Sequence, residues 1–198
     1  MNVDLMAGTS RRPVTTAVPT GEGGLVLWLT GLSGAGKTTL ARLLEAEFLD
    51  RGRLVEVLDG DVVRTHLSKG LGYSREDRDT NVQRIAWVAS RLARAGVVVI
   101  VAAISPYAEA RDAARNLIEA QAPFLEIHIA ASVETCAERD VKGLYARAFR
   151  GEIPDFTGVS APYEEPTSPD VRVDSGELAP GACTELVMTV VRNRLLSD

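Results

Sequence analysis

The chain has 198 residues, of which 45% are hydrophobic and 25% are charged, a composition that suits one compact α/β domain with a sizeable core. The formal net charge of −5 argues against a broad nucleic-acid surface, because binding along a duplex needs clustered Lys and Arg. No apolar run approaches the length of about 18 residues that a membrane span needs, so we expect neither a nucleic acid nor a membrane as a partner.

Residues 1–23 mix Thr, Pro, Gly and Arg without periodicity, which predicts a flexible N-terminal extension before a domain over residues 24–198. Cys136 and Cys183 are isolated in the sequence, so neither a disulfide framework nor a zinc site is indicated. The N-terminus also lacks the apolar stretch of a secretion signal. These features favour a cytoplasmic protein.

The run from Gly31 to Thr38 matches the phosphate-binding pattern G-x-x-x-x-G-K-[ST] at every fixed position. It lies between an apolar, β-rich run over 25–30 and an amphipathic stretch over 38–51, which is the strand, loop, helix order that the motif requires. Glycines let the backbone wrap around a phosphate, so that N–H groups and the positive end of the helix point at one anion. The Lys37 ammonium would reach the β- and γ-phosphates, and the Thr38 hydroxyl would lie on Mg²⁺. The ATP-binding residues expected here are Gly31, Leu32, Ser33, Gly34, Ala35, Gly36, Lys37, Thr38 and Thr39.

Two carboxylates follow the next predicted strand, over residues 55–58. Asp59 and Asp61 are expected at the carboxyl end of that strand, where ligands bind in open α/β sheets. A small-molecule kinase needs a carboxylate near the γ-phosphate to orient the acceptor hydroxyl and to help hold Mg²⁺. A GTP switch is disfavoured because an N-K-x-D motif is absent, and a motor or assembly ATPase because the next buried strand ends in Ser105 instead of an acid.

The middle of the chain alternates helices and strands. A short helix over 61–69 and a glycine-rich turn precede a longer helix, which Ser74 caps and Gly96 ends. The run 97–104 is apolar and β-branched without alternation, which is typical of a central strand buried on both faces. Trp87 lies in an apolar run of the longer helix and is expected in the core. The elements that follow are a helix over 108–120, a strand over 124–130 and a helix over 132–139.

Residues 140–169 are rich in Gly, Pro, Lys and Arg, and they exceed the usual connection of about 2 to 6 residues. Cations so close to phosphate-binding machinery suggest a lid that closes over nucleotide and excludes water; the alternative is a solvated loop whose charges keep the chain soluble. A strand over 171–174 and a helix over 180–196 complete the chain. Five strands that alternate with helices predict a three-layer α/β fold with a mostly parallel five-stranded sheet.

Six further motifs follow the phosphate loop in order. They are Leu58-Asp-Gly-Asp61 with Arg64, Leu71-Gly-Tyr-Ser74, Arg78 with Asn81, Ile104-Ser-Pro-Tyr107, Lys142-Gly-Leu-Tyr145, and Phe156-Thr-Gly158 followed by Pro162-Tyr-Glu164. Over about residues 25–174 the chain therefore resembles the adenylyl-sulfate kinase family of P-loop kinases. The resemblance implies a P-loop NTPase fold and an enzyme that uses ATP and Mg²⁺ to phosphorylate the 3′-hydroxyl of adenosine 5′-phosphosulfate.

The resemblance also implies roles for individual residues. Asp61 is the acceptor-side carboxylate and, with Thr38, a metal-binding residue. Guanidinium forks suit phosphate and sulfate oxygens, and aromatic faces stack on a base. Arg64, Arg78 and Asn81 would therefore hold the phosphosulfate and ribose of the acceptor. Tyr73 and Phe156 would stack on its adenine. The full substrate-binding set is Asp59, Asp61, Arg64, Tyr73, Arg78, Asn81, Ile104, Ser105, Lys142 and Phe156, while Arg139 and Lys142 would contact ATP. Without the resemblance, Arg78 and Asn81 could equally form an exposed helix face and Tyr73 could be a partly buried core residue.

Ser105 resembles the serine that is often marked in this family as a phosphoserine intermediate. We expect direct transfer from ATP to the acceptor instead, because no evident base lies beside Ser105 to activate it. The chain departs from the family pattern at Val62, Tyr73, Val141 and residues 160–162. A kinase for a related nucleotide or sugar acceptor is therefore one alternative, and a slow ATP-hydrolysing sensor is another. A homodimer is expected, although no motif determines the oligomeric state.

Overall fold

The computed structural model describes residues 23–140 and 142–195, so the extension predicted for residues 1–23 lies outside the described residues except at Gly23. Its elements are β1 (Leu25–Thr30), α1 (Lys37–Asp50), β2 (Val55–Asp59), α2 (Gly60–His66), α3 (Arg75–Arg94), β3 (Val98–Ala102), α4 (Ala108–Glu119), β4 (Phe124–Ala130), α5 (Val133–Arg139), α6 (Leu144–Phe149), β5 (Val171–Asp174) and α7 (Pro180–Leu195). None of these described helices is long and apolar enough to cross a membrane.

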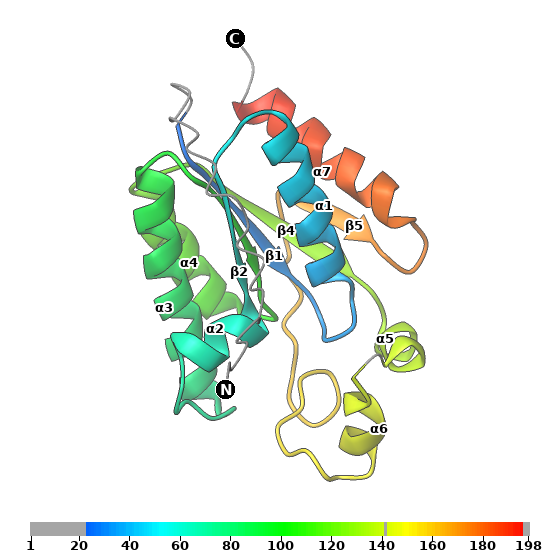
Figure 1. Cartoon of the computed structure of the whole chain (residues 1–198). Helices are drawn as coiled ribbons and strands as arrows, with labels where there is room; N and C mark the ends of the chain where they lie inside the picture. Colours follow the sequence, from blue (N-terminus) through cyan, green and yellow to red (C-terminus); the bar gives the residue numbers. More distant parts are fainter. Residues whose placement is uncertain (1–22, 141, 196–198) are drawn as a thin grey trace, which may run out of the picture.

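The five strands form one sheet in the order β2-β3-β1-β4-β5, and every neighbouring pair is parallel. This confirms the predicted parallel sheet. The chain leaves β1 towards α1 on one face and leaves the adjacent β3 towards α4 on the other face (Figure 1). The two loops therefore diverge at the carboxyl ends of neighbouring strands, an arrangement that opens a ligand-binding crevice in α/β sheets.

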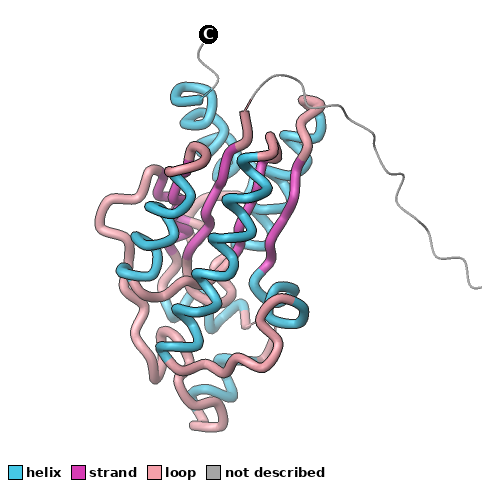
Figure 2. The backbone as a smooth tube through the Cα atoms, turned by 90° about the vertical axis from the view of Figure 1, so that its left-hand side faces the viewer, coloured by secondary structure: helices cyan, strands magenta, loops and turns pink. Residues whose placement is uncertain are grey.

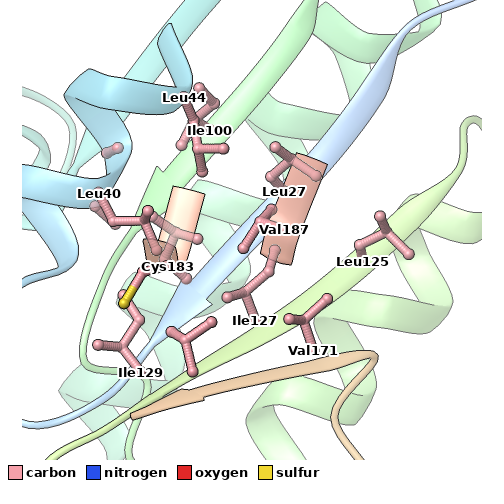
Figure 3. Close-up of a cluster of buried hydrophobic side chains, with 14 of the residues drawn as sticks. Leu27, Leu40, Leu44, Ile100, Leu125, Ile127, Ile129, Val171, Cys183 and Val187 are labelled. Carbon is pink, nitrogen blue, oxygen red and sulfur yellow. The ribbon is translucent and has the colours of Figure 1, made fainter. Parts of the chain in front are cut away.

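Helices cover both faces of the sheet, α1 and α7 on one face and α3 and α4 on the other (Figures 1 and 2). Successive side chains of a strand point to opposite faces, so β1 contributes to two separate cores. Leu27 packs with Leu40 of α1 and Val187 of α7 (Figure 3), whereas Trp28 packs in the second core with Ile85 of α3.

The structure differs from the sequence expectations at two places. Trp87 is 59% exposed, so its prediction as a core residue was wrong. Position 87 lies on the side of α3 opposite Ile85 and Ala89, which are buried, because a helix repeats every 3.6 residues. The helix α6, Leu144–Phe149, was not expected inside the segment 140–169.

Candidate active site

The phosphate loop joins β1 to α1 in a conformation that requires glycine. Gly31 has φ 151° and Gly34 has φ 77°, values that L side chains rarely adopt. A Cβ atom added at Gly31 would lie 2.5 Å from the Ile129 carbonyl oxygen, and one at Gly34 would lie 3.2 Å from that of Cys136. The loop therefore fits closely over β4 and α5 only because these side chains are missing.

Lys37 is folded back onto the phosphate loop. The residue is half-buried, and its ammonium donates to the carbonyl oxygens of Gly31 at 2.9 Å and of Leu32 at 2.7 Å. Burial lowers the pKa of Lys37 to about 8, against the opposing attraction of nearby groups that include Asp59 and Asp61. The ammonium thus lies at the mouth of the loop with two carbonyl contacts, which an anion could replace.

Two more carbonyl groups of the loop are held from outside. The Tyr145 hydroxyl donates to the Ser33 carbonyl oxygen at 3.0 Å, and the Ser175 hydroxyl donates to the Ala35 carbonyl oxygen at 2.7 Å. When the carbonyl group of a trans peptide points out of the turn, the N–H of the same peptide points into it, where an anion binds. These contacts therefore support the loop in its phosphate-binding arrangement.

Arg139 lies at the C-terminal end of α5 beside the same loop. Its guanidinium donates to the carbonyl oxygen of Ser175, contacts the Ser175 hydroxyl at 3.3 Å and reaches the Gly34 carbonyl oxygen at 3.5 Å. Arg139, which was expected to contact ATP, is thus hydrogen-bonded to protein groups at the edge of the phosphate loop. Thr39, also an expected ATP contact, is exposed in the first turn of α1.

The two acids at the end of β2 occupy different positions. Asp59 accepts from the Thr38 hydroxyl at 2.8 Å and from the Asp61 backbone N–H at 3.0 Å, so it both contacts the phosphate-loop side and caps α2. The Asp61 side chain is 73% exposed and pairs with Lys142 from the segment 140–169. The structure therefore joins Thr38 to Asp59, and it brings Asp61 together with a lysine of the segment 140–169.

The aromatic residues expected in the acceptor site lie in two groups. Tyr73 is 59% exposed, with the Arg64 guanidinium carbon 4.4 Å from the centre of its ring and that of Arg78 at 5.6 Å. Phe156 is half-buried and meets the Tyr145 ring edge-on, with the ring centres 5.0 Å apart. Tyr73 is thus largely exposed beside two guanidinium groups, whereas Phe156 is backed by a second ring.

Arg78 connects these two groups. Its Nε donates to the Tyr73 carbonyl oxygen at 2.7 Å, one terminal nitrogen donates to the Thr157 hydroxyl at 2.7 Å, and the other donates to the Asp155 carbonyl oxygen. The last two residues flank Phe156. Arg78 is only 7% exposed, so it fastens the start of α3 to the segment 140–169 and does not belong to an exposed helix face.

Asn81 follows one helical turn after Arg78. It is 7% exposed, and its buried Oδ1 has no hydrogen-bond partner among the described residues. A buried polar atom is normally paired with protein or with a bound molecule. A bound substrate with a hydroxyl or amine group at this position could donate the missing hydrogen bond to Asn81 Oδ1.

Ser105 lies in the loop between β3 and α4 with a backbone φ of 40°, a strained value for a residue with a side chain. Its hydroxyl is 3.1 Å from the Trp28 indole nitrogen, which donates to it, and donates to the Thr30 hydroxyl at 3.0 Å. The Thr30 hydroxyl in turn donates to the Ile104 carbonyl oxygen at 2.7 Å. Ser105 is 3% exposed, so its hydroxyl oxygen is enclosed, and its hydrogen-bond partners among the described residues are all neutral.

Sequence reasoning missed several residues that organise the site. Arg111 donates to the Ser105 carbonyl oxygen at 2.8 Å and is itself held by Glu126 at 2.9 Å. Tyr163 hydrogen-bonds to Thr30 at 3.0 Å. Tyr163 was visible in the Pro162-Tyr-Glu164 motif, but no local pattern marks the isolated Arg111 or Ser175 as part of a site.

Comparisons with known proteins agree with this geometry. Residues 23–174 match the family model described as adenylylsulphate kinase. The chain is 52% identical over 176 residues to the adenylyl-sulfate kinase of Chloroflexus aurantiacus, covering 89% of this chain and 93% of that protein, and 57% identical over 157 residues to a probable adenylyl-sulfate kinase of Synechocystis, covering 78% and 87%. The structure of the Mycobacterium tuberculosis APS kinase in complex with AMPPNP and APS is similar, with a TM-score of 0.83, 40% identity and coverage of 86% of this chain and 99% of that one.

Proposed function

This chain belongs to the adenylylsulphate kinase family, and we infer that it uses ATP to phosphorylate the 3′-hydroxyl of adenosine 5′-phosphosulfate, giving 3′-phosphoadenosine 5′-phosphosulfate. One observation supports placing this reaction at the site described above. The phosphate loop and the guanidinium-aromatic cluster around Tyr73 lie at the same edge of the sheet, and the residues Asp59 and Asp61 stand between them in the chain. A phosphoryl donor and a nucleotide acceptor could therefore meet there.

On the donor side, the backbone N–H groups of residues 31–39 would surround the ATP phosphates. Lys37 would exchange its contacts with the Gly31 and Leu32 carbonyl oxygens for the β- and γ-phosphates. Its charge would then offset the negative charge of the transferred group, and this kind of stabilisation dominates phosphoryl transfer. Arg139 at the edge of the loop would contact the rest of the nucleotide.

The oxygen donors beside the phosphate loop fit Mg²⁺. This ion usually takes one or two carboxylates together with substrate phosphates, not a cage made only of protein. The described residues contain no cluster of three or more His, Cys, Asp or Glu suited to a metal ion, and they do supply Thr38 with Asp59, and Asp61 two residues later. We propose that Thr38 and Asp61 hold Mg²⁺ and that Asp59 positions the Thr38 hydroxyl. When bound, the ion would neutralise charge on the phosphates.

On the acceptor side, Tyr73 and Phe156 would stack on the adenine, and Arg64 and Asn81 would hold polar groups of the acceptor. Arg78 already serves three protein acceptors, so it would act by holding the two aromatic segments as well as by its charge. The enclosed Ser105 and Ile104 would form the floor of the pocket. Asp61 would orient the 3′-hydroxyl and accept its proton.

We propose that residues 140–169 act as a lid. Lys142 of this segment pairs with Asp61 in the structure. When the acceptor hydroxyl binds Asp61, Lys142 would be released and could move to the transferred phosphoryl group. The lid would then also exclude water from the reaction. A homodimer and a cytoplasmic location stay predictions.

The acceptor assignment can be tested by measuring ATP consumption with adenosine 5′-phosphosulfate, AMP and gluconate as acceptors. Of these three acceptors, we expect only adenosine 5′-phosphosulfate to support turnover. Tyr73→Ala and Phe156→Ala should each weaken acceptor binding by about 1–3 kcal/mol and leave the KM for ATP nearly unchanged, because base stacking contributes in that range. Trp87→Ala is the matched control, since Trp87 is as exposed as Tyr73 but lies outside the site. Equal effects on both substrates would reject the stacking assignment.

A further inference from the structure

Tyr145 has no role in the reaction described above, yet it is one of the largest fully buried side chains among the described residues, at 2% exposure. It lies in α6, inside the segment 140–169. The carboxylate of Asp140 receives the backbone N–H groups of Tyr145 and Ala146, both at 3.0 Å. The first turn of α6 is therefore fastened to the end of α5, which fixes the direction of the Tyr145 side chain.

The two ends of the Tyr145 side chain contact different halves of the proposed site. Its hydroxyl donates to the Ser33 carbonyl oxygen of the phosphate loop at 3.0 Å. Its ring supports Phe156 in an edge-to-face contact, with ring centres 5.0 Å apart and planes at 79°. One rigid side chain thus spans from the nucleotide-binding loop to the aromatic residue assigned to the acceptor.

A second contact joins the same two segments. Gly158 lies so close to Leu32 that an added Cβ atom would be 2.9 Å from the leucine Cδ2. Leu32 and Ser33 of the phosphate loop therefore both contact residues of the segment 140–169, Leu32 through Gly158 and Ser33 through Tyr145. If a bound phosphate displaced the phosphate loop, these contacts would also displace Phe156.

We propose that Tyr145 is a positioning residue that couples the nucleotide site to the acceptor site, so that ATP binding strengthens acceptor binding. The proposal rests on the proposed function, in which Phe156 stacks on the acceptor base. Coupling requires that one ligand favour an arrangement that the other also favours. A nucleotide favours the loop arrangement in which the Ser33 carbonyl faces outward to Tyr145, and this arrangement keeps the Tyr145 ring beneath Phe156. By linkage, the acceptor strengthens nucleotide binding by the same factor.

The test measures, by calorimetry, the affinity of the whole chain for adenosine 5′-phosphosulfate with and without a non-hydrolysable ATP analogue. In the wild type we expect the analogue to tighten acceptor binding. Tyr145→Phe keeps the ring contact with Phe156 and removes the hydroxyl, with its bond to the Ser33 carbonyl oxygen and its contact with the Cys136 thiol. It should therefore reduce this tightening by about two- to tenfold, the effect of losing one hydrogen bond to the phosphate loop.

Ser175→Ala is the matched control. It also removes one hydrogen bond to a phosphate-loop carbonyl, that of Ala35, but Ser175 does not contact Phe156. We expect this variant to bind the ATP analogue more weakly while the tightening of acceptor binding stays at the wild-type factor. The coupling role is overturned if both variants reduce the factor alike, or if the wild type shows none. If the wild type does not bind adenosine 5′-phosphosulfate at all, the proposed function fails instead.

Hydrogen exchange gives a readout on the wild type that does not depend on how well a variant folds. The ATP analogue alone should slow exchange in the phosphate loop and also in residues 144–158. In Tyr145→Phe the slowing should stay in the phosphate loop and be lost in residues 144–158. Slowing confined to the phosphate loop of the wild type would contradict the proposal.

Discussion

At the scale of single residues, we expect Lys37 to make nucleotide binding dependent on pH. Its pKa is lowered to about 8 because its ammonium is buried, and bound phosphates would raise that pKa again. Nucleotide affinity should therefore be constant below pH 8 and fall as the pH rises further, by up to about tenfold per unit, because the bound state then takes up a proton. Calorimetry with an ATP analogue between pH 7 and 9.5, in buffers of different ionisation enthalpy, would measure this. The always-charged guanidinium of Lys37→Arg should remove the proton uptake; uptake retained in this variant would assign it to another group.

The two acids after β2 should differ in the step that they serve. Asp59→Asn keeps an oxygen that can cap α2 but loses the charge beside the Thr38 hydroxyl, so we expect mainly a higher KM for Mg-ATP. Asp61→Asn should lower kcat by about 10²-fold or more, the usual contribution of a general base, and should change the KM for Mg-ATP by a smaller factor. Steady-state kinetics of both variants would compare them. The roles are reversed if Asp59→Asn has the larger loss of kcat.

Ser105 should prove dispensable for chemistry. Its hydroxyl lies between the Trp28 indole and the Thr30 hydroxyl, so the change Ser105→Ala removes neutral hydrogen bonds worth about 0.5–1.5 kcal/mol each. We expect turnover of about a tenth of the wild type or more. Two results together would establish the serine as an intermediate: complete loss of activity in Ser105→Ala, and a phosphoserine at position 105 of the wild type, detected by mass spectrometry after incubation with ATP and without acceptor.

At the scale of elements, Arg78 makes α3 and the lid segment depend on each other. A lysine ammonium cannot serve the three acceptors that the planar guanidinium reaches. Arg78→Lys should therefore destabilise the fold by about 1–3 kcal/mol, raise the acceptor KM and expose the region around Asp155 to proteolysis. Arg84→Lys, on the exposed side of the same helix, is the control for a general effect on α3. Equal proteolysis of both variants would argue against Arg78 as the link.

At the scale of the whole molecule, the sheet separates two cores. Ile100 of β3 lies in the core under α1 and α7, and Ile85 of α3 lies in the core on the other face. Each Ile→Val change should reduce the free energy of unfolding by about 0.5–1.5 kcal/mol. The double variant should lose the sum within about 0.5 kcal/mol, because sites without shared contacts act independently. Urea denaturation would measure this; a clear deviation from the sum would show that the sheet transmits strain between its faces.

The features that sequence reasoning predicted correctly depend on near neighbours along the chain. The phosphate loop needs its glycines and its flanking strand and helix. The cap of α3 needs Ser74 and the N–H of Asp77 three residues on, and the structure has this bond at 3.2 Å. Strand β3 needs only an unbroken apolar run. The prediction that Trp87 lies in the core was wrong because an apolar neighbourhood does not tell which side of a helix faces the core. The helix α6 was not predicted because its short run in a polar segment carries little periodicity.

The amino-acid sequence alone was enough for the parallel α/β fold, the phosphate loop, the two carboxylates after β2 and the identity of the family. Only the tertiary structure decided which side chains meet in the site. The Tyr145–Ser33, Arg78–Thr157 and Lys142–Asp61 contacts join residues 112, 79 and 81 positions apart. Such pairs depend on the order of the strands and on the path of the loops above them, and the periodicity of hydrophobic residues specifies the elements without specifying that arrangement. The sequence therefore identified candidate reacting groups, whereas the folded chain determined which side chains meet beside them.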